Sequence, residues 1–160
     1  MQGHVVGLYL KPKTPGERGL PKRSVTEAEL LPSGVRGDYN HYRQQEIHGD
    51  PDSAVLFFPR EITDELRSQG WPIADGDLGE NVATRGIPFA EFRTGRTIRM
   101  GSVLLRTTRA CTPCDVLANL PYVGEERLSE FMRLLVDRRG WYGRVEIAGP
   151  VRVGDVISIE

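Results

Sequence analysis

The sequence predicts a mainly β, barrel-like fold that carries two or three accessory helices. Its apolar runs are short and are separated by glycine and proline, which is typical of many strands joined by turns. Only one long stretch repeats apolar residues at the spacing of an amphipathic helix. Strand and helix patterns do not alternate along the chain, so the parallel sheet of an α/β protein is not expected. These three observations favour a β-barrel or sandwich.

Each expected strand is a short apolar run that stops at a turn residue or a proline. In chain order the expected strands are residues 4–10, 24–31, 53–58, 97–108 as two strands around a turn at Gly101, 142–149 and 154–160. The segments 11–22 and 32–43 are rich in glycine, proline and polar residues. We expect both segments to be loops, because these residue types stabilise turns.

Two segments carry the signals of a helix. Residues 60–70 form the shorter one, with Gly70 in the position of a C-cap. Residues 125–140 form the longer one, and Gly140 is expected to end it. Its apolar face follows the i, i+3, i+4, i+7 pattern at Leu128, Phe131, Met132 and Leu135. The longest helix of the fold is therefore expected near residues 125–139.

Length and charge restrict the class of protein. A chain of 160 residues is expected to form one domain over residues 1–160, with a core that needs no disulfide. Its net charge of −1 gives no general attraction to nucleic acid or to a membrane, and neither is expected as a partner. No apolar run reaches the roughly 20 residues that span a bilayer, and the N-terminus lacks the features of a signal peptide. We therefore expect a cytoplasmic, reducing location, where structural disulfides are rare.

Both cysteines of the chain, Cys111 and Cys114, lie in the segment RTTRACTPCDVL. A zinc site needs about four ligands, and the chain has no second CxxC and no HxxxH. A redox pair normally begins a helix within a βαβ unit, a context that is missing here. Two alternatives stay open: a pair of buried small thiols, or a reactive thiolate favoured by Arg106 and Arg109. Pro113 stiffens the turn before Cys114 and gives its sulfur a fixed direction.

The segment RACTPCDVL resembles the central motif of the MOSC domain, a module named from the C-terminal part of molybdenum-cofactor sulfurases. Four further segments resemble the family in the expected order along nearly the whole chain. They are GLPKRSVTEAELLPSGVRGDYNHYR, HGDPDSAVLFF, GDLGENVATRGI and RRGWYGRVEIAGPVRVGDVI. Each segment is weak alone, but five in register make the resemblance specific. The ending of GDYNHYR departs from the usual pattern of the family, which leaves a role for His41 open.

The resemblance implies a barrel-like fold and a site for the molybdenum cofactor (molybdopterin). Cys114 matches the family's Pro-Cys position, where the thiolate either ligates molybdenum or carries sulfane sulfur. Cys111 is then a neighbour or a resolving thiol. The implied functions are reduction of N-hydroxylated compounds, sulfur delivery for metal-sulfur cluster or cofactor assembly, or binding without chemistry. The first two imply an electron-transfer partner or a sulfur donor. The family's separate N-terminal β-domain and a pyridoxal-phosphate lysine motif are not found.

A polyanionic pterin needs guanidinium groups and backbone N–H groups as well as a soft sulfur ligand. The residues expected to bind it are Arg109, Asn81, His48, Arg138 and Arg144. Several of them have structural alternatives. Arg138 and the adjacent Arg139 better fit a solvated C-terminal end of the long helix, where cations complement the helix dipole. Asn81 fits a turn equally well, and His48 better fits a hydrogen bond within its loop.

Overall fold

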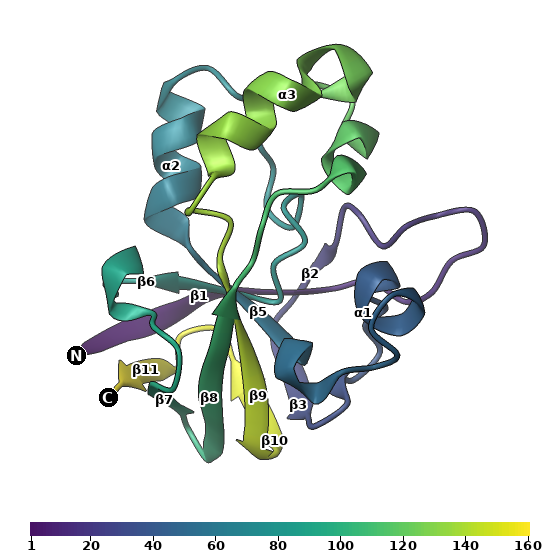
Figure 1. The fold of residues 1–160 in the computed structure, drawn as a ribbon. Helices are drawn as coiled ribbons and strands as arrows, with labels where there is room; N and C mark the ends of the chain where they lie inside the picture. The colour runs from purple at the N-terminus through teal and green to yellow at the C-terminus, as the bar shows by residue number, and fades with distance from the viewer.

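Seven strands close into a barrel in the computed structural model, which describes residues 1–160 (Figure 1). The ring runs in the order β11, β7, β8, β9, β5, β6, β1 and closes where β1 pairs with β11, while β2 extends β1 outside the ring. A small second sheet has the order β10, β3, β4. The predicted fold class, mainly β with two or three helices, is confirmed.

The strands are short and most have one buried face. They are β1 Gln2–Leu10, β2 Arg23–Val25, β3 Glu27–Leu31, β4 Gly34–Val35, β5 Val55–Pro59, β6 Val82–Arg85, β7 Thr97–Met100, β8 Val103–Ala110, β9 Trp141–Ile147, β10 Gly149–Arg152 and β11 Val156–Ile159. The α-helices are α1 His41–Gln45, α2 Arg60–Ser68 and α3 Gly124–Leu135. Three 3₁₀ turns, η1 Pro51–Ser53, η2 Phe89–Glu91 and η3 Asp115–Asn119, join these elements. None of the helices is long and apolar enough to cross a bilayer.

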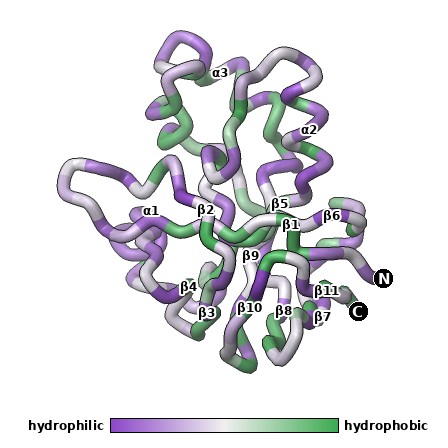
Figure 2. The backbone as a smooth tube through the Cα atoms, turned by 180° about the vertical axis from the view of Figure 1, so that it is seen from behind, coloured by the Kyte–Doolittle hydropathy of each residue, from purple (hydrophilic) through white to green (hydrophobic).

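The molecule has two apolar cores. The larger one fills the barrel with aliphatic side chains of nearly every strand, such as Val5, Leu105 and Ile157. The second core lies where α2 and α3 pack together at one end of the barrel (Figure 1). Trp71 and Phe131 meet there, with ring centroids 4.7 Å apart. Both helices change between hydrophilic and hydrophobic residues along the tube in Figure 2, as amphipathic helices do.

Several predicted elements occur where the sequence placed them. The hairpin of residues 97–108 turns at Gly101, which has a φ of 55°. The helix expected at 60–70 is α2, and the strand expected at 53–58 is β5, which continues into Pro59. By contrast, the single strand expected at 24–31 is two strands, β2 and β3, which belong to different sheets. The chain bends at Thr26, whose carbonyl accepts a hydrogen bond from the N–H of Val153.

All strand pairs are antiparallel except one, so the sheet is not the parallel sheet of an α/β protein. Strands β5 and β6 are parallel and are connected through α2. The sequence gives little sign of this unit, because β6 has only four residues. The loop expected at 32–43 likewise contains β4 and the beginning of α1, and the closing segment contains β10 as a further strand.

The longest helix, α3, begins one residue before the expected segment but ends at Leu135 rather than near 139. Val136 leaves the helical conformation with a ψ of 128°, and Asp137 adopts a positive φ of 57°. Gly140, with a φ of 103°, packs so close to β5 that a Cβ would lie 2.5 Å from the carbonyl oxygen of Phe57. Residues 136–140 therefore form a turn that brings the chain back to the barrel.

Candidate functional site

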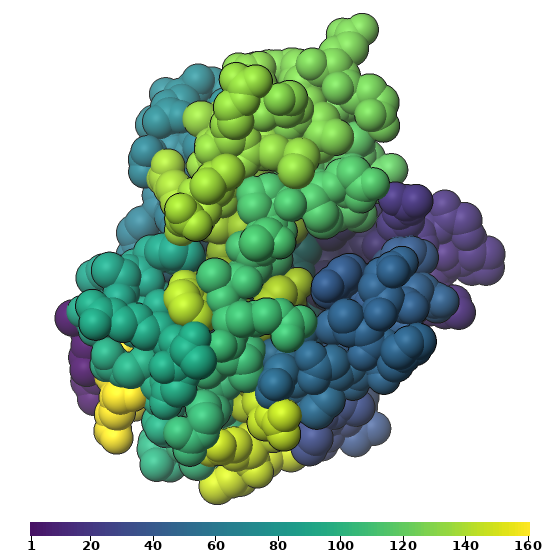
Figure 3. All heavy atoms as spheres, in the orientation of Figure 1, coloured from purple at the N-terminus to yellow at the C-terminus, as the bar shows by residue number.

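A cavity of about 570 Å³ opens beside the end of β8. Its walls come from segments far apart in the sequence: residues 18–22, residues 39–46, Gly79, residues 109–116, and the segment from Arg139 to Tyr142. In Figure 3 the surface is hollowed where the segment after β8, the segment around α1 and the loop 11–22 meet. Its volume lies within the range typical of small-molecule and cofactor sites.

The two cysteines lie on this cavity in different environments. Strand β8 ends at Ala110, and the N–H of Cys111 then donates to the carbonyl of Gly140 at 2.8 Å. The Cys111 side chain is buried, and its thiol donates to the hydroxyl of Tyr142 at 3.5 Å. Cys114 is exposed and precedes η3 with an extended backbone. Both thiols are free, but only that of Cys114 is open to solvent.

Tyr142 reaches the cavity from β9. Burial raises the pKa of its hydroxyl far above the ordinary value, and the neighbouring Cys111 raises it further. Tyr142 therefore stays protonated at neutral pH. Its oxygen accepts from Cys111, which leaves the O–H proton available for an acceptor in the cavity.

Arg109 and Arg106 both lie on β8, but only Arg109 lines the cavity. The guanidinium of Arg109 pairs with Asp50 at 3.3 Å, hydrogen-bonds the hydroxyl of Ser53 and lies 5.4 Å from the ring centroid of Tyr142. Arg106 instead pairs with Glu146 on the neighbouring strand at 2.7 Å. One of the two arginines beside the cysteines is therefore available to a ligand.

The other residues that the sequence proposed as cofactor-binding do not line the cavity. His48 is exposed in its loop with a positive φ of 52°. Arg138 pairs with Glu65 of α2 at 2.5 Å, and Arg144 pairs with Asp52 at 2.6 Å. His41, whose role the sequence left open, does line the cavity, and its Nδ1 lies 3.2 Å from the hydroxyl of Tyr39.

Asn81 uses its whole amide to hold the cavity wall together. Its Oδ1 accepts from the N–H of Leu56 at 3.1 Å, and its Nδ2 donates to the carbonyl of Tyr9 at 3.3 Å and to Asp38 at 2.9 Å. The same Asp38 carboxylate pairs with Lys22 at 2.7 Å, and both side chains are buried. Burial lowers the pKa of Lys22, and Asp38 opposes that effect. The side chain of Asn81 thus joins β1, β5 and the buried ion pair.

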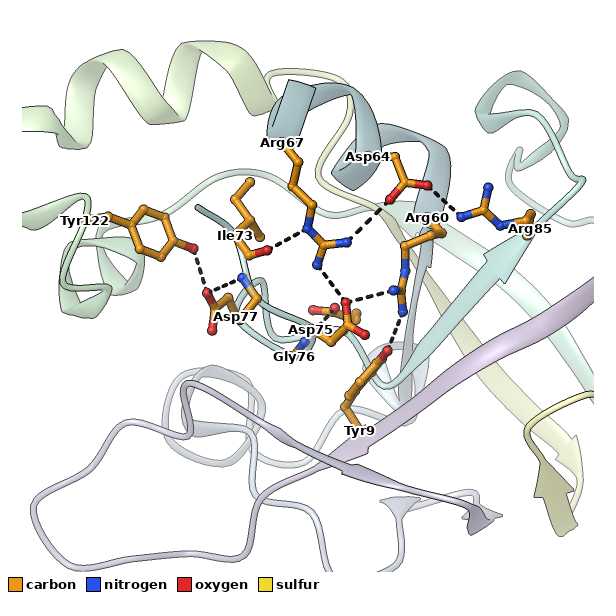
Figure 4. Close-up of polar contacts among 12 residues, drawn as sticks. Tyr9, Arg60, Asp64, Arg67, Ile73, Asp75, Gly76, Asp77, Arg85 and Tyr122 are labelled. Atoms are coloured by element: carbon orange, nitrogen blue, oxygen red, sulfur yellow. Dashed lines mark hydrogen bonds and ion pairs between the residues drawn. The ribbon is translucent and has the colours of Figure 1, made fainter. Parts of the chain in front are cut away.

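A polar network fixes the loop between α2 and β6, which carries Gly79 into the cavity wall (Figure 4). Asp75 accepts from Arg60 and from Arg67 of α2, each at 2.7 Å. Arg67 also donates to the carbonyl of Ile73 at 2.6 Å. Further along the loop, Tyr122 donates to Asp77 at 2.8 Å. The loop is therefore tied both to α2 and to the segment before α3.

Sequence analysis left Arg139 between a solvated helix end and a role in the site, and did not include it among the residues expected to bind the cofactor. It lines the cavity with only 4% of its surface exposed, because the turn after Leu135 directs it inward. The signal that identifies it is the glycine that follows. The close approach of Gly140 to β5 pulls the preceding residue against the barrel.

The cavity combines a thiol with charged side chains, of which the basic ones outnumber the acidic Glu46 and Asp115. No group of three His, Cys, Asp or Glu side chains comes together to hold a metal ion without other ligands. One exposed thiol, Cys114, is present together with four basic side chains, Arg18, Lys22, Arg109 and Arg139. At Gly79 the φ of 77° favours glycine, and a Cβ would lie 3.0 Å from a side-chain methyl group of Leu20, which would have to shift. A soft thiol and several cationic side chains in one cavity suit an anionic ligand.

Residues 44–158 match the sequence profile of the MOSC domain family. Among curated proteins, YiiM from Escherichia coli is 28% identical over 92 residues, which cover 55% of this chain and 40% of YiiM. Among solved structures, the YuaD protein from Bacillus subtilis has a TM-score of 0.82 at 21% identity, covering 99% of this chain and 96% of that one. YiiM from Geobacillus stearothermophilus has a TM-score of 0.74 at 21% identity, covering 99% and 75%.

This chain has the same fold as these two solved structures. Its match to Escherichia coli YiiM covers less than half of that protein. The family profile spans most of this chain, from α1 to β11, and includes both cysteines and Arg139. The chain belongs to the MOSC domain family.

Proposed function

We propose that the cavity binds the molybdenum cofactor and that the Cys114 thiolate is the ligand to molybdenum from the protein. The observation that carries the proposal is the position of Cys114. It is an exposed thiol at the mouth of a cavity whose lining includes four basic side chains. A thiolate is a soft ligand suited to such a metal, and the basic groups suit an anionic pterin.

Each residue has a separate task in this proposal. Cys114 would hold the metal, because its thiol is the one that is exposed. Arg109, kept in place by Asp50 and Ser53, supplies positive charge to the cavity that Cys114 also lines. Tyr142 fills the wall beneath Arg109 and accepts a hydrogen bond from the Cys111 thiol. When bound, the cofactor supplies two-electron redox chemistry at molybdenum, which we propose serves the reduction of N-hydroxylated compounds by electrons from a partner protein.

A sulfur carrier is the second candidate function. Here Cys114 holds sulfane sulfur as a persulfide, received from a sulfur-donor protein and passed on for cofactor or metal-sulfur cluster assembly. The exposure of Cys114 favours this candidate, because a persulfide must be reached by two partners in turn. Cys111, buried on the same cavity, is the candidate resolving thiol.

The test is to express the wild type, Cys114→Ser and Cys111→Ser in a host that makes the cofactor. Bound molybdenum and cyanolysable sulfur are then measured per mole of protein. We expect Cys114→Ser to retain at least about tenfold less molybdenum or less sulfur than the wild type, since no other soft ligand is exposed there. Cys111→Ser is expected to lose much less. Equal losses in both variants would instead indicate a cysteine pair, and a wild type with neither species would leave a binding module without chemistry.

A further inference from the structure

The side chains of Arg138 and Arg139, adjacent in the turn after α3, point in different directions. Arg138 pairs with Glu65 of α2 and remains partly exposed, outside the cavity. Arg139 lies inside the molecule and lines the cavity. The positive φ of Asp137 and the close contact of Gly140 with β5 produce this separation. The chain therefore provides its own matched pair, one surface arginine and one in the cavity.

The guanidinium of Arg139 is buried without a hydrogen-bond partner at Nε and Nη1. A buried polar group that is left unpaired costs about 1–3 kcal/mol, and more when it is charged. Its Nη2 lies toward the cavity wall, 3.8 Å from where a Cβ on Gly79 would stand. These N–H groups form a fork that no protein acceptor fills.

Glu80 is a buried acidic side chain close enough to Arg139 to feel its charge, but it does not occupy that fork. Its carboxylate is buried, and its Oε1 accepts from the N–H of Gly76 at 3.0 Å. Its Oε2 has no partner. The two charges attract each other through space, but no hydrogen bond joins them. Glu80 thus accepts none of the Arg139 N–H groups, and Nε and Nη1 remain without a protein acceptor.

We propose that Arg139 and the hydroxyl of Tyr142 form an oxyanion subsite inside the cavity, which binds the phosphate group of a phosphate monoester. A guanidinium binds phosphate through two parallel N–H donors, and the free O–H of Tyr142 adds a third. The inference deepens the proposed function and rests on it for the identity of the ligand. If the exposed Cys114 holds the metal, the buried Arg139 would hold the phosphate of the same cofactor.

The subsite is tested first with inorganic phosphate on protein free of cofactor. Phosphate is titrated by calorimetry into the wild type, Arg139→Gln and Arg138→Gln at constant ionic strength, with chloride as the reference salt. We expect Arg139→Gln to bind phosphate about ten- to a hundredfold more weakly, the loss expected for hydrogen bonds to a charged group. Arg138→Gln is expected to bind like the wild type. Equal affinity in Arg139→Gln and wild type, or no binding by the wild type, would overturn the proposal.

A second measurement separates a binding role from a structural one. If Arg139 is retained for a ligand, the double variant Arg139→Gln with Glu80→Gln, which removes both buried charges, should have a Tm in phosphate-free buffer no lower than that of the wild type. Added phosphate should raise the Tm of the wild type but not that of the double variant. A large fall in Tm without phosphate would show that the charges serve the fold, and would contradict the proposal.

A third measurement identifies the source of the phosphate. The variants are expressed in the cofactor-producing host, and released pterin is quantified by its fluorescence. We expect Arg139→Gln to retain several-fold less pterin than Arg138→Gln. If it retains as much, the cofactor's phosphate is not the ligand, and that part of the proposal is wrong. If even the wild type holds no pterin while the phosphate difference persists, the subsite stands and the proposed function fails.

Discussion

Glu80 is enclosed by protein directly after Gly79, and the charged groups that act on it belong to the cavity. Burial raises the pKa of its carboxyl group above the ordinary value, and the hydrogen bond from Gly76 and the charges of Arg139 and Lys22 offset this only in part. Burial of Glu80 in the folded protein thus disfavours the ionised form of its carboxyl group. A residue of this kind is common beside functional sites, where charge is arranged for a ligand rather than for stability.

The raised pKa predicts a pH-dependent contribution to stability. The folded state holds the Glu80 proton at pH values where the unfolded chain has lost it. The stability that Glu80 contributes to the folded state is therefore fully present below its unfolded pKa of about 4.5 and is lost as the pH rises through its folded pKa. In the wild type the free energy of unfolding should fall over this pH range, and in Glu80→Gln this fall should be absent. Denaturant titration at several pH values measures it. Glu125→Gln, an exposed residue of α3, is the control. Parallel curves for Glu80→Gln and wild type would contradict the assignment.

At the scale of single residues, the sequence could predict chemistry better than position. The motif around Cys114 identified the exposed thiol and Arg109, because short motifs carry their chemistry in adjacent residues. Asn81 and Arg139 show the limit. The amide of Asn81 bonds three partners within the protein, and one of them, the carbonyl of Tyr9, lies 72 residues away in the sequence. Local sequence does not show that such distant partners are present. The direction of Arg139 depends on where α3 ends, which propensity alone places poorly.

Strand β11 is the element that closes the barrel, since it pairs with β1 on one side and with β7 on the other. Its residues alternate between the core and the solvent. Ile157 is completely buried in the barrel core, whereas its neighbour Val156 is 51% exposed. The strand was predictable from this alternation together with the turn that precedes it.

Truncation of these two neighbours should therefore have very different costs. We expect Ile157→Ala to lower the free energy of unfolding by about 2–5 kcal/mol, because it leaves a cavity inside the barrel. Val156→Ala should change it by less than about 0.5 kcal/mol. Denaturant unfolding monitored by tryptophan fluorescence measures both. Similar costs for the two variants would show that β11 does not pack as described.

Elements that depend on distant partners were the ones that sequence analysis missed. Strand β6 has four residues, and only its position between β1 and β5 gives it a sheet to join. The same holds for β4 and β10, which pair only with β3. In contrast, α2 and the hairpin of β7 and β8 are specified by local signals, a C-terminal glycine and a tight turn, and were predicted correctly.

On the scale of the whole molecule, the barrel serves as a frame whose loops build the site. The cavity draws its lining from the first loop, the segment around α1, the loop after α2, the end of β8 and the turn after α3. The polar network of Figure 4 and the amide of Asn81 hold these segments together. The barrel itself was predictable from hydrophobic pattern and turns. The assembly of the cavity was not, because it joins residues that lie up to about 120 positions apart, from Arg18 to Arg139.

The central claim is that the Cys114 thiolate binds molybdenum in this cavity. X-ray absorption at the molybdenum edge tests it most directly, because it counts the sulfur atoms bound to the metal. Each protein is reconstituted with isolated cofactor in excess, so that the variants are compared at equal loading. We predict that Cys114→Ser shows one sulfur scatterer fewer than the wild type, while Cys111→Ser shows the same number as the wild type. An unchanged sulfur count in Cys114→Ser would contradict the claim.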